Sequence, residues 1–369
     1  MPVIQLEALD TLFFRDGKPF TMGEDNFAEG AFPPSPSVIY GALRTAYIAQ
    51  HLGKNGKTID DLIRDTEGLV ITDIGFEIGT TKYFPMPLDY AQSKEDEEKA
   101  ICLTLEDNSS GFTSAKTPFV CISNEHIEQI SDGLFNTRQL INYLEGHSYE
   151  AKITKWSSEI TLESKFGNSR GNETRSTSDD DGNVYRVGMR RLAKDTPDEI
   201  EFLRIIVDYS LIDLTFKESD IIRVGGEGKS MLINNYEADS SKKVSANDYK
   251  QEDKYFKVYF STPSFFKKAL KPAFIDDLNK KGYEIEIIAT AIGKPLKFGG
   301  WDVKNKEPKP MLNAVPSGSV YYFKINNPNK GLTDIVAELS INSLSEFKKN
   351  EGFGLFKIAH LKFNENLSL

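Results

Sequence analysis

The sequence contains few of the residues on which catalytic and metal sites usually depend. Its 369 residues include only two cysteines, Cys102 and Cys121, too far apart for a CxxC pair, so we expect a reducing compartment and no cysteine metal site. No HxxxH pair is present, and each histidine is more typical of a surface or hydrogen-bonded position. The four histidines are His51, His126, His147 and His360. We therefore predict no catalytic residue, no metal site and no cofactor.

Long apolar runs are also missing. Uncharged apolar stretches such as 205–207 and 287–292 are far shorter than the roughly 20 residues that cross a bilayer. The start, MPVIQLEALD, lacks a basic segment followed by an apolar block, so no secretory signal is expected. With 39% hydrophobic residues the chain can bury a core and is long enough for two domains. We predict a soluble, cytoplasmic protein.

The charge is acidic overall but uneven. A net charge of −10 argues against binding nucleic acid through bulk electrostatics. Residues 165–194, however, contain seven basic and four acidic side chains, a local charge of +3. Residues 294–309 contain five basic and two acidic side chains, again +3. Nucleic acid contact is therefore expected only at local sites.

The last third of the chain predicts a βαββαβ order of elements. Alternating apolar residues favour strands, and apolar residues at helical spacing favour helices. The expected strands cover residues 254–260, 283–292, 319–325 and 352–359, and the expected helices cover 264–279, with a break at Pro272, and 332–339. This order is typical of the split ferredoxin-like unit.

The first part repeats this order with insertions. A strand is expected at 3–15, a helix at 35–52, and further strands at 69–76 and 201–209. A short helical stretch follows, and then a glycine turn that runs into a strand. Ser35 is its expected N-cap and Pro36 lies in its first turn. We predict an α+β fold of two tandem ferredoxin-like (RRM-like, βαββαβ) domains. They are residues 1–245, with insertions over 77–200, and residues 246–369.

The insertion contains a predicted β-hairpin arm. Residues 180–183 have turn chemistry, and the flanks 174–177 and 184–191 can pair across it. The predicted arm carries four arginines: Arg175, Arg186, Arg190 and Arg191.

The stretch VGGEGKSML, residues 224–232, resembles a phosphate-binding loop. A P-loop needs a glycine five positions before its Gly-Lys pair, where this chain has Arg223, and it opens a helix, which MLINNY does not favour. We therefore do not expect nucleotide hydrolysis. A plain turn that uses glycine for positive φ remains an alternative.

A second glycine turn, EGFGLFKI at residues 351–358, stands at the matching place in the second half. It resembles the RNA-reading motif of RRM folds, but Glu351 and Leu355 replace a basic and an aromatic residue. We therefore expect backbone contact rather than base stacking, since bare glycine backbone lets a phosphodiester approach its amides.

Several motifs together resemble one known family. In chain order they are FRDGKPF, FPPSPSVIYGALRTA, VGGEGKSM, GGWDVKNKEPKP with VPSGSVYYF, and the terminal GFG. They are similar to the third subunit of the Cmr complex, a RAMP-superfamily component of type III-B CRISPR effectors. Regions 77–160 and 236–253 remain unmatched.

The resemblance implies a non-catalytic RNA-binding subunit. Members bind the 5′ repeat-derived tag of the guide RNA and dock onto the large polymerase-like subunit and the first backbone subunit of the filament, for antiviral defence. The resemblance also implies a hetero-oligomeric complex that does not associate with a membrane. The residues predicted to contact RNA are Arg15, Arg44, Arg170, Arg175, Arg186, Arg190, Arg191, Gly225, Gly226, Gly228, Lys229, Lys297, Trp301, Gly352 and Gly354.

Individual residues in this set have alternative interpretations. Trp301 is a candidate base-stacking platform beside Lys297 or else a packed tryptophan under a glycine bend. Arg15 is either an RNA contact or a surface charge at a strand end. Arg170 and Arg175 lie in a polar, turn-rich stretch that has no apolar face to serve, which favours RNA contact.

Two other function classes stay open. Some RAMP proteins are endoribonucleases that process precursor guide RNA, chemistry that usually recruits histidine. The other class is a protein-interaction module whose basic windows meet acidic partners. Equal, negligible retention of tagged and scrambled RNA would support the interaction module, and precursor cleavage that disappears in alanine variants of the four histidines would support the endonuclease.

Overall fold

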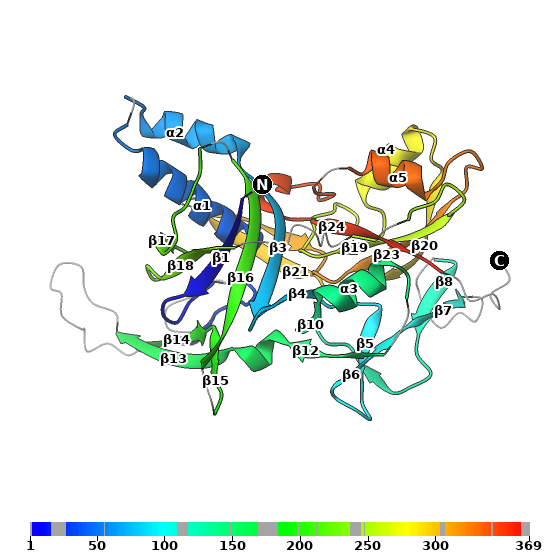
Figure 1. Ribbon diagram of the computed structural model, residues 1–369, viewed down its shortest axis with the longest axis horizontal. Helices are drawn as coiled ribbons and strands as arrows, with labels where there is room; N and C mark the ends of the chain where they lie inside the picture. The colour runs from blue at the N-terminus through cyan, green and yellow to red at the C-terminus, as the bar shows by residue number, and fades with distance from the viewer. Residues whose placement is uncertain are drawn as a thin grey trace.

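The computed structural model describes residues 2–15, 27–54, 56–108, 117–147, 150–168, 184–197, 200–211, 213–236, 245–246, 248–302, 307–340 and 342–362. It is a mixed α+β structure rich in strands, as expected (Figure 1). In Figure 1 the N-terminal sheet lies at the left, the C-terminal sheet at the right, and most of the inserted region below them. Within the described ranges, no helix is both long and apolar enough to span a bilayer.

The N-terminal unit is built on a nine-stranded sheet with helix α1 (Pro36–His51) on one face. Its central strands run antiparallel in the order β3 (Val70–Ile78), β16 (Ile200–Ser210), β1 (Val3–Ala8), β18 (Ser230–Asn235). The outer strands are β17 (Asp220–Arg223), β4 (Thr81–Pro85), β10 (Gly133–Asn136), β12 (Thr154–Lys155) and β15 (Ala193–Asp195). Alternation along each central strand sends every second side chain into the core beneath α1.

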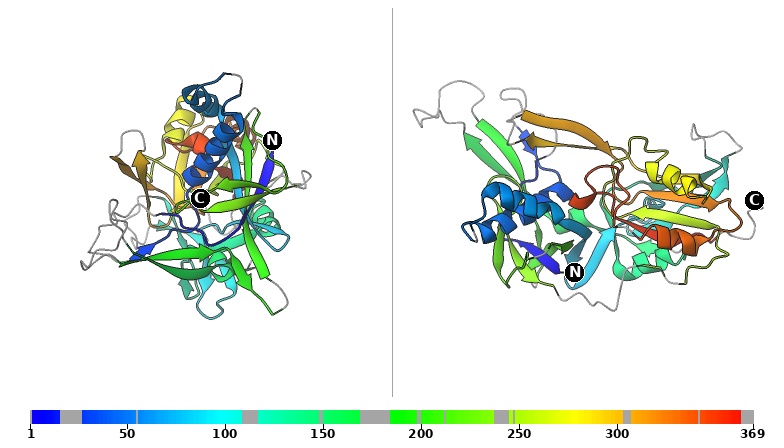
Figure 2. Two further views of the ribbon diagram at one scale, coloured as in Figure 1. Left: turned by 90° about the vertical axis from the view of Figure 1, so that its left-hand side faces the viewer. Right: turned by 90° about the horizontal axis from the view of Figure 1, so that it is seen from above.

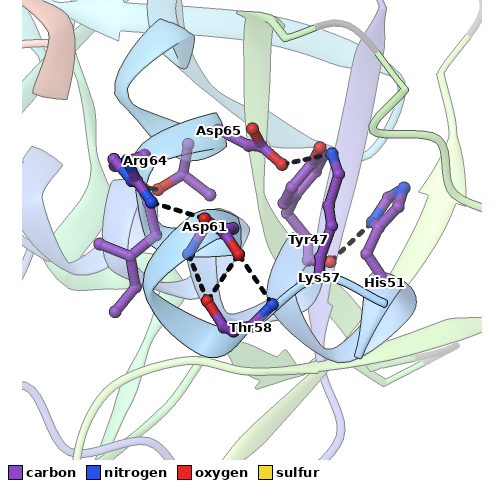
Figure 3. A network of polar contacts seen from close by, with 9 residues as sticks. Tyr47, His51, Lys57, Thr58, Asp61, Arg64 and Asp65 are labelled. Carbon is purple, nitrogen blue, oxygen red and sulfur yellow. Dashed lines mark hydrogen bonds and ion pairs between the residues drawn. The ribbon is translucent and has the colours of Figure 1, made fainter. Parts of the chain in front are cut away.

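Helix α1 confirms the predicted helix boundaries. Ser35 is its N-cap and Pro36 its first residue, although the Ser35 side chain makes no capping hydrogen bond. The buried stripe includes Ile39 and Leu43. Helix α2 (Ile59–Asp65) follows; its capping box, in which Thr58 and Asp61 bond each other's backbone amides, is drawn in Figure 3.

The expected short helix before the first glycine turn is wrong. Residues 211 and 213–219 form no helix in the described chain and lead straight into β17. Asp213 and Ser219 have positive φ values, 65° and 67°, which a right-handed helix does not allow. The first unit therefore ends in a β17–β18 hairpin.

The C-terminal unit has the expected βαββαβ order. Its elements are β19 (Tyr255–Phe260), α4 (Ala273–Lys280), β20 (Ile285–Ala291), β23 (Val320–Ile325), α5 (Leu332–Glu338) and β24 (Phe356–His360), with sheet order β20-β23-β19-β24. Helix α4 starts only after Pro272. Residues 264–272, which we expected to be helical, are not. A hairpin of β21 (Leu296–Asp302) and β22 (Glu307–Ala314), which was not predicted, is inserted between β20 and β23. Pro308 and Pro310 interrupt the alternating strand pattern of β22, so the sequence analysis assigned no element to this stretch.

The inserted region packs on the C-terminal sheet. It comprises β5 (Tyr90–Ser93), β6 (Lys99–Cys102), β7 (Thr104–Asp107), β8 (Phe119–Ile122), β9 (Ile127–Glu128), α3 (Thr137–Leu144) and β11 (Ala151–Lys152). Tyr90 and Tyr143 from this region share a core with Tyr259 and Tyr322 of the sheet. On the opposite face, Phe256 and its neighbours pack in a separate core with α4 and α5. Both faces of the C-terminal sheet are thus covered by protein.

A buried ion pair joins the insertion to this sheet. Asp89, fully buried, accepts hydrogen bonds from Lys257 Nζ at 3.2 Å, Tyr143 Oη at 2.9 Å and Tyr322 Oη at 2.7 Å. Burial raises the pKa of both tyrosines well above the ordinary value, and the charge of the nearby Asp89 carboxylate raises it further. The two tyrosines therefore stay neutral donors.

The arm is confirmed as a hairpin, with a different first strand. Strand β14 (Val184–Arg191) pairs along its whole length with β13 (Thr161–Asn168), and also with β2 (Phe27–Glu29) in parallel. The expected first flank, residues 174–177, lies outside the described residues.

The two units meet at β3 and at the end of the C-terminal unit. Ser37 on α1 bonds Glu351, and Lys348 Nζ donates to Ser37 Oγ at 3.0 Å. Leu355 is part of the N-terminal core. Short 3-10 turns at Thr66–Gly68, Trp156–Glu159 and Lys349–Glu351 complete the described elements.

Candidate nucleic-acid interface

The first glycine loop is the turn of the β17–β18 hairpin. Arg223 pairs with Ser230, the Val224 amide donates to the Lys229 carbonyl at 3.0 Å, and the Lys229 amide donates to the Gly226 carbonyl at 3.3 Å. The turn leads into a strand and not into a helix, so it lacks the helix N-terminus that a P-loop places at phosphate. It is not a P-loop.

Gly225 is packed closely against Phe13, Gly226 is bonded to Phe13 through its backbone amide, and Gly228 is open. At Gly225, where φ is +84°, an added Cβ would lie 2.8 Å from the Phe13 carbonyl oxygen. The Gly226 amide donates to the same oxygen at 3.0 Å. Gly228, at φ +65°, is exposed and has nothing within 4 Å of its Cβ direction. A phosphodiester can therefore approach the backbone at Gly228.

Lys229 is largely occupied by protein. Its ammonium pairs with the Asp10 carboxylate and lies 3.4 Å from Thr11 Oγ1, and its side chain is 11% exposed. The hydrogen bond from Lys229 lowers the pKa of Asp10, an effect to which the Thr11 amide adds. Lys229 thus fixes the loop beside residues 10–14 and shares its charge with Asp10.

The base of the arm lies against the same segment. Phe13 packs with Val187 and Met189 of β14. Leu12 and Arg190 exchange backbone hydrogen bonds of 2.7 and 2.8 Å, and Arg190 Nη2 donates to the Gly30 carbonyl at 3.1 Å. The structure therefore brings the first glycine loop and the arm together around residues 10–15.

The remaining predicted arginines of this region differ in their partners. Arg15 bridges Gly30 through its backbone and has an exposed side chain. Arg186 is exposed, donates to Ser164 Oγ at 2.5 Å and lies over the Phe166 ring at 5.8 Å. Arg191 makes a two-bond pair with Asp195, both distances 3.2 Å. Arg170 and Arg175 lie outside the described residues.

The second glycine loop is buried in protein. At Gly352, with φ +92°, an added Cβ would come within 2.9 Å of Ile71 Cγ2 on β3. At Gly354, with φ +72°, it would overlap the backbone nitrogen of Ser345. Close packing accounts for both glycines, so the expected RNA contact of Gly352 and Gly354 receives no support. The two loops look alike in sequence but differ in burial.

The other predicted contacts lie apart from this region. Arg44 on α1 donates to Thr66 Oγ1 at 2.8 Å and lies over the Tyr40 ring at 5.7 Å. Lys297 is exposed near the start of β21. Trp301 pairs through its backbone with Pro308 in the same hairpin, and its side chain lies outside the described atoms.

A large cleft that sequence reasoning missed lies between the two units. Its volume is about 780 Å³. It is lined by the segment 31–36, which follows β2, by Ile74 and Phe76 of β3, and by the base of the β21–β22 hairpin. The proline-rich FPPSP motif is the signal in the sequence that could have pointed to it.

The outer face of the N-terminal sheet is acidic. Glu7 and Glu77 flank Arg204 at 2.5 and 3.6 Å. Asp73 lies 3.2 Å from Lys82 and 3.8 Å from Lys357, and Asp208 lies 3.9 Å from Lys82. Four carboxylates against three cations make this face a poor surface for phosphate.

Two of the four histidines line one pocket. His147 and His360 lie around a space of about 430 Å³ together with three carboxylates, Glu145, Asp248 and Asp253. His360 stacks on Tyr249 and its Nδ1 lies 3.6 Å from Asp253. His51 is elsewhere, at the end of α1, where it stacks on Tyr47 and bonds the Tyr47 carbonyl at 2.8 Å (Figure 3).

The described residues offer no site for cysteine chemistry or metal binding. Neither cysteine is in a disulfide, and burial raises the pKa of the Cys121 thiol to about 12, which keeps it protonated. In the described part of the chain no group of three or more metal-ligating side chains is found.

Several solved structures are similar to the chain at low identity. A chain of the type III-B Cmr-beta complex bound to cognate target RNA and AMPPnP is 18% identical, with 87% of this chain and 86% of that chain covered and a TM-score of 0.47. For a chain of the Csm3–Csm4 subcomplex of a type III-A CRISPR-Cas interference complex these values are 11%, 91%, 96% and 0.37. For a chain of a Csm1–Csm4 cassette in complex with pppApA they are 11%, 89%, 87% and 0.34.

No curated protein matches the chain in sequence. Residues 4–360, however, match the family described as CRISPR-associated protein (Cas_Cmr3). This match spans nearly all of the described chain and confirms the resemblance seen in the motifs. The chain belongs to the CRISPR-associated Cas_Cmr3 family.

Proposed function

We propose that this protein holds the 5′ tag of the guide RNA in a type III-B CRISPR effector and does not cut it. The observation that carries the proposal is the exposed turn at Gly228 beside the base of the arginine-bearing arm. Bare backbone amides and nearby guanidinium groups are what a single-stranded sugar-phosphate chain requires. Arg15 and Arg186 are exposed cations of this surface, and Arg223 and Lys165 are exposed there as well.

Two other large surfaces are unsuitable for RNA, which supports this location. The inserted region covers the C-terminal sheet face on which an RRM stacks bases. The outer face of the N-terminal sheet carries Glu7, Asp73, Glu77 and Asp208. We therefore propose that the RNA lies at the first glycine loop, the arm and the β21–β22 hairpin.

We further propose that the chain consists of two ferredoxin-like domains, residues 1–245 and 246–369, and bridges two partners. The partners are the large polymerase-like subunit and the first backbone subunit of the filament. Family membership and the strand orders β3-β16-β1-β18 and β20-β23-β19-β24 support this assignment. In an assembled effector the protein would serve antiviral defence.

Filter binding tests the tag assignment. A guide RNA with its natural 5′ tag is compared with one whose tag is scrambled, using the full chain with and without its large partner, at two salt concentrations. We expect preferential retention of the tagged RNA, tighter with the partner present. With about five phosphate contacts on a single strand, the slope of log K against log salt should be roughly −3 to −4. Equal and negligible retention of both RNAs would contradict the proposal.

The alternative of precursor cleavage has one observation in its favour, the pocket that contains His147 and His360. The three carboxylates of this pocket outnumber its two lysines, Lys250 and Lys362, so it is not complementary to a phosphodiester, and we favour binding alone. Incubation of the full chain with precursor guide RNA tests it. Cleavage that disappears in the His147→Ala and His360→Ala variants would establish the endonuclease, whereas we expect the precursor to stay intact.

A further inference from the structure

A groove of about 450 Å³ lies on the helical side of the C-terminal unit. It is lined by α4, by the end of α5 and by the segment 344–349. The two helices pack on the face of the C-terminal sheet opposite the inserted region, and in Figures 1 and 2 they lie toward the other end of the molecule from the arm. The groove is therefore separate from the surface that we assign to RNA.

Much of the lining of this groove is apolar. Phe274, Leu278, Leu339 and Leu344 contribute to it and are buried. Phe347 also lines it and is 42% exposed. Aromatic side chains that remain exposed beside buried apolar groups are typical of surfaces that bind protein. The groove therefore offers a place where an apolar side chain of a partner can leave water.

The segment 344–349 is held in place by hydrogen bonds to the start of the α4 region. The Glu346 carboxylate accepts the Ala273 amide at 3.1 Å with one oxygen and the Lys267 amide at 3.1 Å with the other. The Ser345 hydroxyl accepts the Phe265 amide at 3.0 Å. Because the groove is formed in advance, a partner that enters it loses less free energy in ordering this segment.

The three carboxylates that line the groove all have partners within the protein. Glu346 is occupied by the two backbone amides. Asp277 pairs with Lys280 at 3.0 Å, and Glu338 pairs with Lys281. These acids therefore do little to repel an acidic occupant.

Two cations of the groove have no such compensation. Lys267 and Lys349 line it and are exposed, and within the described part of the chain neither has a carboxylate partner. The Lys267 ammonium lies 5.9 Å from the centre of the Phe347 ring. Segments 264–281 and 338–349 together contain seven lysines and four acidic residues, a local charge of +3 in a chain of net charge −10. The groove is thus complementary to an acidic partner.

We propose that this groove docks an acidic segment of a partner protein, with an apolar side chain against Phe347 and carboxylates on Lys267 and Lys349. The inference rests on the proposed bridging function, for which it supplies a surface, and is independent of tag binding. A single RNA strand requires a track of cations with aromatic platforms for its bases. The lining instead combines two available lysines with aliphatic side chains and three carboxylates, which fits a protein segment better.

Photo-crosslinking from the groove identifies the occupant. Phe347→p-benzoylphenylalanine places a photoreactive ring in the groove of the full chain, which is assembled with the purified subunits and guide RNA of the effector. Leu52→p-benzoylphenylalanine is the matched control, because Leu52 is 56% exposed and lies at the end of α1. We expect the Phe347 variant to crosslink to a subunit segment with an excess of Asp and Glu, and the Leu52 variant not to reach that segment.

Charge reversal tests the two lysines. The Kd of the crosslinked subunit for the full chain is measured with Lys267→Glu, Lys349→Glu and Lys54→Glu. Lys54 is also exposed but follows α1, so this control introduces the same charge away from the groove. We expect each groove variant to weaken binding about tenfold and the control to match the wild type. Retention of tagged guide RNA, measured on the same preparations, should be unchanged.

The possible failures are distinguishable. A crosslink from Phe347 to guide RNA or to a segment without an acidic excess would overturn the inference, and so would wild-type affinity in both groove variants. No crosslink in an intact effector would refute the groove and leave bridging through another surface standing. Failure of the wild-type chain to join any other subunit would refute the bridging function and the inference together.

Discussion

Two arginines on β14 illustrate how a carboxylate partner limits what a cation contributes to phosphate binding. Arg186 is exposed on the arm, whereas Arg191, on the same strand, is held by both oxygens of Asp195. A guanidinium held by both oxygens of a carboxylate, as in Arg191, must give up that pair to meet a phosphate, whereas the Arg186 side chain is exposed to solvent.

We therefore predict that Arg186→Ala weakens binding of tagged RNA more than Arg191→Ala does. The loss of one phosphate contact on a single strand should reduce the salt slope by about 0.7. Filter binding across a salt series measures both slopes. Equal slopes for the two variants would mean that pairing with Asp195 does not matter.

Asp208 provides a prediction about pH. Burial raises the pKa of its carboxyl, with Lys82 acting in the opposite direction. Stability from a group with a raised folded-state pKa is present below the unfolded pKa and is lost as pH rises through the folded pKa. At neutral pH the ionised Asp208 is therefore a burden to the fold.

Asp208→Asn should leave the free energy of unfolding at pH 7 unchanged or raise it by about 0.5 to 1 kcal/mol, and the gain should vanish near pH 4. Asp73→Asn is the matched control, because it removes the carboxylate 3.2 Å from Lys82 and should cost about 1 to 3 kcal/mol. Urea denaturation at both pH values provides the comparison. A destabilised Asp208→Asn at pH 7 would show that its ion pair outweighs its burial.

The two glycine loops illustrate what single elements reveal and conceal. Gly228 and Gly354 have nearly the same φ, +65° and +72°, and both follow the pattern expected of glycine at a turn. Their surroundings differ: Gly354 packs against Ser345 in a loop that also contacts Ile71 of the distant strand β3, whereas Gly228 has nothing within 4 Å of its Cβ direction. No local pattern carries that information.

An alanine at either position should carry the same backbone strain, about 1 to 2 kcal/mol. Gly354→Ala should cost a further 1 to 3 kcal/mol because its methyl group overlaps Ser345. Denaturant unfolding of the full chain separates the two costs. Similar stabilities of the two alanine variants would mean that the second loop accommodates the added methyl group at little cost.

The insertion is held on the C-terminal sheet by a buried pair that can be tested by a double-mutant cycle. Asp89→Asn leaves Lys257 buried without its counterion and should cost about 3 to 5 kcal/mol. Lys257→Met should cost a similar amount, and the double variant should recover about 0.5 to 3 kcal/mol. Strictly additive losses would indicate that the two side chains do not interact. The readout is the free energy of unfolding of the full chain.

The elements that could be predicted are those with a regular apolar pattern. The C-terminal βαββαβ order and helix α1 follow from alternation, helical spacing and the Ser35-Pro36 start. The β21–β22 hairpin was missed because Pro308 and Pro310 mask it, and the absent helix after β16 reflects positive φ at Asp213 and Ser219. Exceptions set by proline and by turn geometry escape periodicity.

Across the whole molecule, the site could be predicted only in part. The sequence pointed to the first glycine loop and the arm, which the structure brings together around residues 10–15. It also pointed to Gly352 and Gly354, which the structure buries between the two units. The cleft joins residues as distant as Pro33 and Met311, and no pattern within one segment could have paired them.

Under the proposed function, the architecture leaves one end of the molecule for RNA. The insertion covers the C-terminal sheet, carboxylates line the outer N-terminal sheet, and both hairpins run toward the same end (Figure 2). A chain with a net charge of −10 can in this way confine nucleic acid to a single region.

Photo-crosslinking of an assembled effector tests this directly. A guide RNA with 4-thiouridine at successive tag positions is irradiated, and the crosslinked peptides of this chain are identified. We predict crosslinks within residues 184–191 and 223–230. Crosslinks confined to α4 and α5 or to β7 and β8, or a complete absence of crosslinks from this chain, would contradict the assignment.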